Sequence, residues 1–233
     1  MCEKCGCQTG MGTKPKVIDV NKSLFEANEK IGEQNRHHVE RMGAVAINMI
    51  SSPGAGKTTL LEATADALKD SVTFGVIEGD IETEKDAQRI RAKGIPAVQL
   101  TTGGACHLDA SLVHHGIHEL EHIVPGGRLD IIFIENVGNL VCPAAFYLGE
   151  HKRIVMVSVP EGSDKPAKYP RAFIGSDLFV ISKADLLPYF DFSVEEAISE
   201  ARRLNPSIDV LIISPKSGQG MDKWLDYLSG ILK

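Results

Sequence analysis

The sequence predicts an α/β protein whose mostly parallel β-sheet carries helices on both faces. One observation is that strand-like apolar runs alternate with helix-like segments along most of the chain, and parallel strands need such crossovers. The other is a glycine-rich segment between the first apolar run and a helical pattern, where phosphate-binding loops occur. No internal repeat or low-complexity tract interrupts this alternation, which indicates one folded domain.

The expected elements follow from hydrophobic periodicity. Strands are predicted at 44–50, 72–77, 97–100, 130–134, 154–159, 178–181 and 210–213. Helices are predicted at 57–69, 83–93, 109–122, 194–204 and 221–232. A further helix, capped by Ser23, is expected to run to about Met42. Because ligands in such sheets bind at the carboxyl ends of the strands, the motifs that follow those ends are expected to form the functional site.

Composition excludes several classes of protein. The chain has 233 residues and a formal net charge of −6, which does not suit a nucleic-acid binder. No apolar run approaches the ~20 residues that span a bilayer, and the N-terminus lacks the apolar core of a secretory signal. We therefore expect a cytoplasmic protein without membrane or nucleic-acid partners. Two parts are expected, a flexible cysteine-rich metal-binding tail at 1–21 and a folded domain at 22–233.

The glycine-rich segment at 51–59 has the pattern of a phosphate-binding loop. Backbone N–H groups freed by Gly54 and Gly56 would bind phosphate oxygens, Lys57 would reach the β- and γ-phosphates, and Thr58 would hold Mg²⁺. Ser51 stands where the usual pattern has its first glycine. The alternative is a turn between a strand and a helix that binds no nucleotide. The expected nucleotide contacts are Gly54, Ala55, Gly56, Lys57, Thr58 and Thr59.

Two carboxylates follow other apolar runs. Asp80 ends the second run, and Glu135 lies where GTPases carry the Asp of an Asp-x-x-Gly motif. Both would hold Mg²⁺ or its bound water, and with Lys57 they are the expected catalytic residues. The alternative for either acid is a solvated loop residue.

Base recognition is predicted at Ser182-Lys183-Ala184-Asp185, similar to the Asn-Lys-x-Asp of GTPases. The Asp185 carboxylate would accept hydrogen bonds from the N1 and N2 donors of guanine, and the Lys183 stem would stack on the base. Ser182 replaces the usual Asn, and a helix cap at Ser182 or Asp185 is the alternative. The next strand is followed by three further expected contacts, Ser214, Pro215 and Lys216.

Cysteine and histidine residues indicate metal binding, since thiolates and imidazoles are good ligands for Zn²⁺ and Ni²⁺. Cys106-His107 and Cys142 follow strands that should neighbour the nucleotide, although free cysteines are also common as small buried hydrophobes. A second predicted site lies in the tail, where three thiolates fall within six residues and suit Ni²⁺, unless the tail cysteines have no function. Its ligands would be Cys2, Cys5 and Cys7. The histidines at 114, 115, 118 and 122 are interpreted as a solvated helix face.

Taken together, the loop at 51–59, the tail cysteines, Cys106-His107, Cys142 and the segment 182–185 resemble the HypB family over nearly the whole chain. The resemblance implies a P-loop GTPase of the SIMIBI type that uses GTP, GDP and Mg²⁺. It also implies a tight nickel site in the tail and a nickel or zinc site at Cys106. Its expected partners are a second copy of the chain, a HypA-type zinc-binding protein and the large subunit of [NiFe]-hydrogenase.

The resemblance also implies that a lysine from one subunit of the dimer reaches the nucleotide of the other. Lys168, in the segment 164–170, is our choice, and a solvent-facing lysine is the alternative. Three other functions stay open. They are an accessory GTPase for urease, a small-molecule kinase with the same loop, and a nickel-sequestering protein with little GTPase role.

Overall fold

The computed structural model describes residues 17–68 and 71–232. Its centre is a seven-stranded sheet in the order β3-β2-β4-β1-β5-β6-β7, in which all neighbouring strands run parallel. The strands are β1 (Val45–Ser51), β2 (Phe74–Asp80), β3 (Ala97–Thr101), β4 (Ile131–Glu135), β5 (Lys152–Ser158), β6 (Leu178–Ser182) and β7 (Asp209–Ile212). All seven predicted strands are confirmed, and so is the α/β class.

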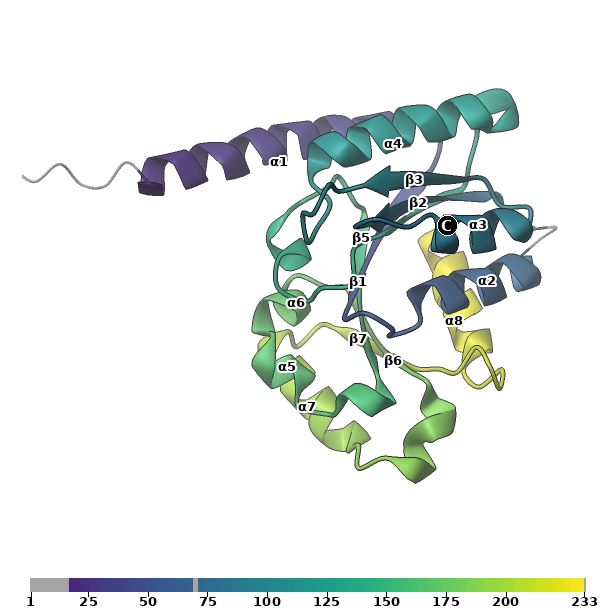
Figure 1. Ribbon diagram of the computed structural model, residues 1–233. Coiled ribbons are helices and arrows are strands. Elements are labelled where there is room, and N and C mark those ends of the chain that lie inside the picture. The colour runs from purple at the N-terminus through teal and green to yellow at the C-terminus, as the bar shows by residue number, and fades with distance from the viewer. Residues whose placement is uncertain (1–16, 69–70, 233) are drawn as a thin grey trace, which may run out of the picture.

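Helices lie between most consecutive strands, before the first strand and after the last one (Figure 1). They are α1 (Val17–Arg41), α2 (Lys57–Leu68), α3 (Lys85–Ala92), α4 (Ala110–Ile123), α5 (Lys165–Lys168), α6 (Pro170–Ile174), α7 (Val194–Leu204) and α8 (Met221–Ile231). The sequence pattern did not predict the short α5 and α6, because four or five residues are too few to show a helical period. No helix in the described part of the chain is long and apolar enough to cross a membrane.

The N-terminal helix is longer than its pattern predicts. α1 begins at Val17, six residues before Ser23, and so extends into the segment assigned to the tail. Residues 1–16, including Cys2, Cys5 and Cys7, lie outside the described residues. α1 ends one residue before Met42, close to the predicted end.

Alternating side chains of the strands bury two faces of the sheet, because successive residues of a strand point to opposite sides. On one face, Met49 and Phe133 pack against α2, α3 and α8, whose Trp224 is fully buried. The other face packs against α1 and α4 near β2 and β4, and against α6 and α7 near β5 and β6. Figure 1 shows these layers.

The register brings the carboxyl ends of β1, β2 and β4 to one edge. Glu78 of β2 is the Cα partner of Glu135 of β4, and Met49 of β1 is the partner of Glu135 on its other side. The loop after β1 leads directly into α2 at Lys57. Residues that are far apart in the chain therefore meet where α2 begins.

Candidate functional site

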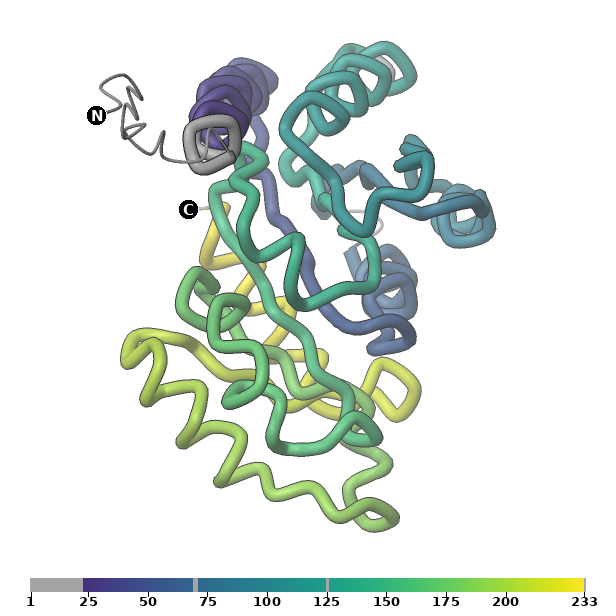
Figure 2. The backbone as a smooth tube through the Cα atoms, turned by 60° about the vertical axis from the view of Figure 1, so that its left-hand side comes forward, coloured from purple at the N-terminus to yellow at the C-terminus, as the bar shows by residue number. Residues whose placement is uncertain are grey.

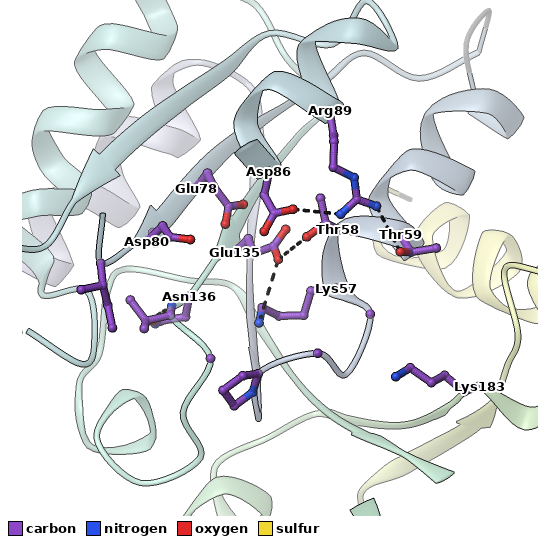
Figure 3. Close-up of a pocket in the computed structure, with 17 residues that line it drawn as sticks. Lys57, Thr58, Thr59, Glu78, Asp80, Asp86, Arg89, Glu135, Asn136 and Lys183 are labelled. Carbon is purple, nitrogen blue, oxygen red and sulfur yellow. Dashed lines mark hydrogen bonds and ion pairs between the residues drawn. The ribbon is translucent and has the colours of Figure 1, made fainter. Parts of the chain in front are cut away.

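A cavity of ≈ 490 Å³ opens at this edge of the sheet (Figure 3). It is formed by the loop after β1, the start of α2, the ends of β2 and β4, and α3. Its cationic side chains are Lys57, Arg89 and Lys183, and its acidic ones include Glu78 and Glu135. From the predicted nucleotide and magnesium residues it gathers Gly54, Gly56, Lys57, Thr58, Thr59, Asp80, Glu135 and Lys183.

The loop at 51–59 has the backbone that its glycines predict. Gly54 and Gly56 have φ of +73° and +96°, a region that side chains rarely adopt. Lys57 Nζ donates a hydrogen bond to Ser51 Oγ at 2.9 Å. The serine that replaces the usual glycine thus holds the lysine side chain in the cavity.

Glu78 and Glu135 lie side by side in the cavity wall, each only 3% exposed. Thr58 Oγ1 donates to Glu135 Oε1 at 2.9 Å, and Lys57 Nζ lies 3.9 Å from the same oxygen. The Oε2 atoms of both glutamates have no hydrogen-bond partner among the described residues. Burial and the neighbouring carboxylate raise the pKa of Glu78, and burial raises the pKa of Glu135 despite Lys57.

This pair fits a divalent cation. Buried carboxylate oxygens without partners are the hard ligands that Mg²⁺ prefers, and the Thr58 hydroxyl lies beside them. Glu78 was not among the predicted site residues. The sequence signal that identifies it is its position two residues before Asp80, which puts both side chains on the same face of β2.

Asp80 has a different environment from Glu78. Its carboxylate accepts hydrogen bonds from the backbone N–H groups of Glu82 and Thr83 at 3.0 and 3.3 Å. Burial acts to raise the Asp80 pKa, but these hydrogen bonds outweigh it and the pKa is lowered. Asp80 therefore shapes the turn after β2 while it lines the cavity.

Sequence reasoning also missed Arg89 on α3. Its guanidinium makes hydrogen bonds with Glu62 at 2.6 Å, Asp86 at 2.9 Å and Thr59 at 3.2 Å. These bonds hold a positive charge at the cavity wall (Figure 3). An exposed arginine in a helix carries no motif that would single it out in the sequence.

The two predicted base-side segments meet in space. The Asp185 carboxylate accepts a 2.6 Å hydrogen bond from the Ser214 hydroxyl, which joins the loop after β6 to the loop after β7. Ser182 Oγ donates to the carbonyl of Ala55 at 2.6 Å, so the residue that replaces Asn is tied to the phosphate loop. Lys183 has the left-handed φ of 56°.

Lys168 does not line the cavity. Its Nζ forms an ion pair with Asp164 at 2.5 Å, one turn earlier.

Cys106, His107 and Cys142 come together as predicted. One potential ligand atom from each lies within 4.8 Å of the other two, and both cysteines are free thiols. Burial lowers the His107 pKa, which favours the neutral imidazole that binds metals. Hydrogen bonding with Cys106 and burial raise the pKa of the Cys142 thiol.

Asn136 links this cluster to the nucleotide cavity. Its Oδ1 accepts hydrogen bonds from the backbone N–H groups of Leu108 at 3.1 Å and Val137 at 3.0 Å. Leu108 follows His107 directly, and Asn136 lines the cavity next to Glu135. Sequence reasoning passed over Asn136 because its role depends on a partner 28 positions away.

Comparison with known proteins agrees with this geometry. The model of the family described as CobW/HypB/UreG, nucleotide-binding domain, matches residues 45–212, which hold both the cavity and the thiol cluster. Fold and site therefore define a P-loop nucleotide-binding protein of that class. Hydrogenase maturation factor HypB of Escherichia coli (strain K12) is 47% identical over 213 residues, which cover 91% of this chain and 72% of that protein. The chain belongs to the HypB family of hydrogenase maturation factors.

Two further relatives bear on the site. The hydrogenase/urease maturation factor HypB of Helicobacter hepaticus is 41% identical and covers 91% of this chain and 87% of its own length. The crystal structure of HypB from Helicobacter pylori in complex with nickel has a TM-score of 0.85 and 38% identity, and the match covers 88% of this chain and 95% of that one.

Proposed function

We propose that the protein is a GTP-hydrolysing nickel metallochaperone, active in the cytoplasm, that supplies nickel during [NiFe]-hydrogenase maturation. The observation that carries this proposal is that Cys106, His107 and Cys142 lie on loops that leave the nucleotide-binding edge, with Asn136 bonded to both regions. Nickel in complex with a relative that is 38% identical supports the choice of metal.

Nucleotide binding would use the loop at 54–59. Its backbone N–H groups and Lys57 would meet the phosphates, with Arg89 adding positive charge at the cavity wall. Lys183 would stack along guanine and the Asp185 carboxylate, oriented by Ser214, would accept from its N1 and N2 donors. The contacts at Pro215 and Lys216 stay part of this proposal.

Thr58, Glu78 and Glu135 would hold Mg²⁺, with Asp80 close by. The ion would neutralise charge that develops on the phosphates during hydrolysis. Glu78 and Glu135 must lose any shared proton to bind it, because only the ionised carboxylates are strong ligands.

Coupling would run through the segment after β4. A γ-phosphate would order the residues after Glu135, and its loss would release them. Asn136 would pass this change to Leu108 and hence to His107, and Gly138 lies so close to the phosphate loop that an added Cβ would come within 2.8 Å of the Pro53 Cα. Nickel would then bind with different affinity in the two nucleotide states.

The dimer belongs to the same proposal. Three ligands leave the Cys106 site incomplete for a tetrahedral metal, and a second subunit or water would complete it. Val141, 59% exposed beside Cys142, would lie in the interface. Lys168 would leave Asp164 to reach the partner's nucleotide.

Zinc is the alternative metal for the site at Cys106, His107 and Cys142. The tail at Cys2, Cys5 and Cys7 would hold nickel more tightly than the Cys106 site does. A HypA-type protein and the hydrogenase large subunit would be the partners with which this protein exchanges nickel.

Nickel titration in two nucleotide states tests the proposal. We expect the nickel affinity of the Cys106 site to differ between GDP and a non-hydrolysable GTP analogue. Lys57→Ala should abolish hydrolysis and leave the fold intact, which far-UV circular dichroism and thermal unfolding would verify. Equal nickel affinities in both states would refute the coupling. Hydrolysis by Lys57→Ala at the parent rate would refute the nucleotide site.

A urease client is a second candidate, because one relative is a hydrogenase/urease maturation factor. Nickel transfer to each apo-enzyme, measured with the same loaded protein, distinguishes the two clients.

A further inference from the structure

α1 and α4 lie side by side along one face of the sheet, and both Figure 1 and Figure 2 show this pair. Their contact contains three histidines and a glutamate that neither the nucleotide cavity nor the Cys106 cluster uses. The group is His38 from the last turn of α1 with His114, His118 and Glu121 from α4.

His38, His118 and Glu121 have the geometry of a metal-binding set. One potential ligand atom from each lies within 4.8 Å of the other two. His38 Nε2 lies 3.0 Å from Glu121 Oε2, close to the separation of about 3.3 Å between two ligands of a tetrahedral zinc ion with bonds near 2.0 Å. The ring centroids of His38 and His118 are 4.5 Å apart.

The His38 ring has a binding atom that the fold leaves unused. His38 is 5% exposed, and its Nδ1 is buried without a hydrogen-bond partner in the part of the chain that the structure describes. Leaving a buried polar atom unpaired costs free energy, about 1–3 kcal/mol. A cation bound at Nδ1 would pair this atom, whereas a cation bound at Nε2 would replace the 3.0 Å contact with Glu121 and leave Nδ1 as it is.

His114 flanks the set with a defined tautomer. Asn35 Nδ2 donates to the carbonyls of Ala110 and Leu148 at 2.8 and 3.0 Å, which orients the amide and makes Asn35 Oδ1 the acceptor towards His114. His114 Nδ1, 2.8 Å from that oxygen, therefore carries the proton. The lone pair of His114 is then on Nε2, in a ring 4.7 Å from that of His118.

We propose that His38, His118 and Glu121 form a metal site between α1 and α4 for a borderline divalent cation such as Zn²⁺ or Ni²⁺. Imidazole and carboxylate ligands without sulfur suit these ions and are too few and too nitrogen-rich for Mg²⁺ or Ca²⁺. The site is distinct from Cys106, because His118 lies eight residues into α4, about 12 Å along its axis. The proposed site joins α1, which follows the tail, to α4, which follows His107.

Cobalt spectroscopy on a thiol-free chain tests the site directly. In the full-length protein with Cys2, Cys5, Cys7, Cys106 and Cys142 replaced by Ser, we expect one equivalent of Co²⁺ with visible d–d absorption and no thiolate-to-cobalt band. His118→Gln and Glu121→Gln should each weaken Co²⁺ binding at least tenfold. The matched control is His115→Gln, because His115 is exposed on α4 and its ion pair is with Glu119, which is outside the proposed set. It should bind Co²⁺ like the parent.

A second measurement guards against a thiol-free chain that fails to fold. In the otherwise unchanged protein, His118→Gln should bind one equivalent less Zn²⁺ at saturation in equilibrium dialysis, whereas His115→Gln should not. Three outcomes would overturn the proposal. They are no Co²⁺ absorption in a folded thiol-free chain, unchanged binding in His118→Gln and Glu121→Gln, or an equal loss in His115→Gln. None of them bears on nickel delivery, which rests on other residues.

Discussion

The Glu78 and Glu135 side chains occupy an electrostatically unfavourable position, because they are two buried carboxyl groups on neighbouring strands and the one lysine in contact, Lys57, lies beside Glu135. Such a pair stays partly protonated unless a cation neutralises it. The same feature that makes the cavity suitable for Mg²⁺ therefore costs stability when the ion is absent. This trade between stability and function is common in sites that bind charge.

Glu78→Gln should stabilise the metal-free protein at alkaline pH. Folded Glu78 keeps its proton above the ordinary Glu pKa of 4.5, where the unfolded chain has lost it, so stability falls as pH rises through that window. Glutamine removes this dependence. We expect a higher melting temperature at pH 8 in EDTA, by about 2–4 °C for each kcal/mol added to the free energy of unfolding. The gain at pH 5 should be smaller. Thermal unfolding from pH 5 to 8 measures it.

Glu195→Gln is the matched control, since Glu195 is exposed on α7 and does not line the cavity. It should show no such pH-dependent gain. A melting temperature of Glu78→Gln below the parent value at pH 8 would contradict the burial argument.

Asp185→Asn should exchange base specificity. In the proposed contact the carboxylate would accept hydrogen bonds from guanine N1–H and N2–H₂, whereas an amide N–H₂ would suit the additional carbonyl of xanthine. Losing the charge-assisted bond costs about 1.5–3 kcal/mol, roughly ten- to a hundredfold in GTP affinity. Competition binding of GTP and xanthosine triphosphate measures the exchange, with the exposed Asp191→Asn as control. GTP affinity equal to that of the parent would mean that Asp185 only caps the turn at Ser214.

At the scale of elements, the segment after β4 contacts both the nucleotide cavity and the loop that carries His107. Glu135 ends the strand at the cavity, Asn136 bonds the loop that carries His107, and Cys142 follows six residues later. The Asn136 side chain is 1% exposed, and its Nδ2 donates a hydrogen bond to Asn48 Oδ1 of β1 at 3.4 Å. Under the proposed coupling, a displacement of this segment would change both sites together, since buried polar networks have few alternative arrangements.

Asn136→Ala should uncouple the two sites. It leaves the Leu108 and Val137 N–H groups without their acceptor, at about 1–3 kcal/mol of stability. We expect the ratio of nickel dissociation constants in GDP and in a GTP analogue to approach one. Asn35→Ala is the control, because Asn35 is equally buried but bonds α4 and the loop at Leu148. It should lose similar stability and keep the parent ratio. A parent-like ratio in Asn136→Ala would exclude this route.

At the scale of the whole molecule, the two sets of thiols belong to different parts of the chain. Cys106 and Cys142 lie on loops of the packed domain. Cys2, Cys5 and Cys7 precede α1, whose N-terminal half extends beyond the edge of the sheet in Figure 1. We therefore expect mutations in one set to act independently of the other.

The two sites should separate in chelator competition. Replacing Cys2, Cys5 and Cys7 by Ala should remove the tighter nickel site and its thiolate-to-metal absorption and leave GTP hydrolysis nearly unchanged. Cys106→Ala or Cys142→Ala should remove the second metal and its effect on dimerisation. Both affinities should fall below neutral pH, because thiolates must lose protons to bind. Full nickel affinity in the tail variant would show that the tail is not the tight site.

Much of this protein was determined by local sequence. The alternation of apolar runs and helical patterns predicted all seven strands and the helices α2, α3, α4, α7 and α8, because strand and helix periods are local properties. Lys57, Thr58, Glu135, Cys106, His107 and Cys142 could be singled out because each belongs to a short motif or follows a strand end. The placement of each motif at one edge follows from parallel topology alone.

Tertiary structure decided which side chains meet. Glu78 became a partner of Glu135 through the register of β2 and β4, and Asn136 became a link because its Oδ1 accepts a hydrogen bond from the Leu108 N–H. The histidines of α4 read as a solvated face in the sequence, and His118 is exposed, but the buried His38 of α1 lies close enough to His118 and Glu121 for the three to form one candidate metal set. Register and helix packing depend on the whole folded core, so no local pattern encodes these contacts.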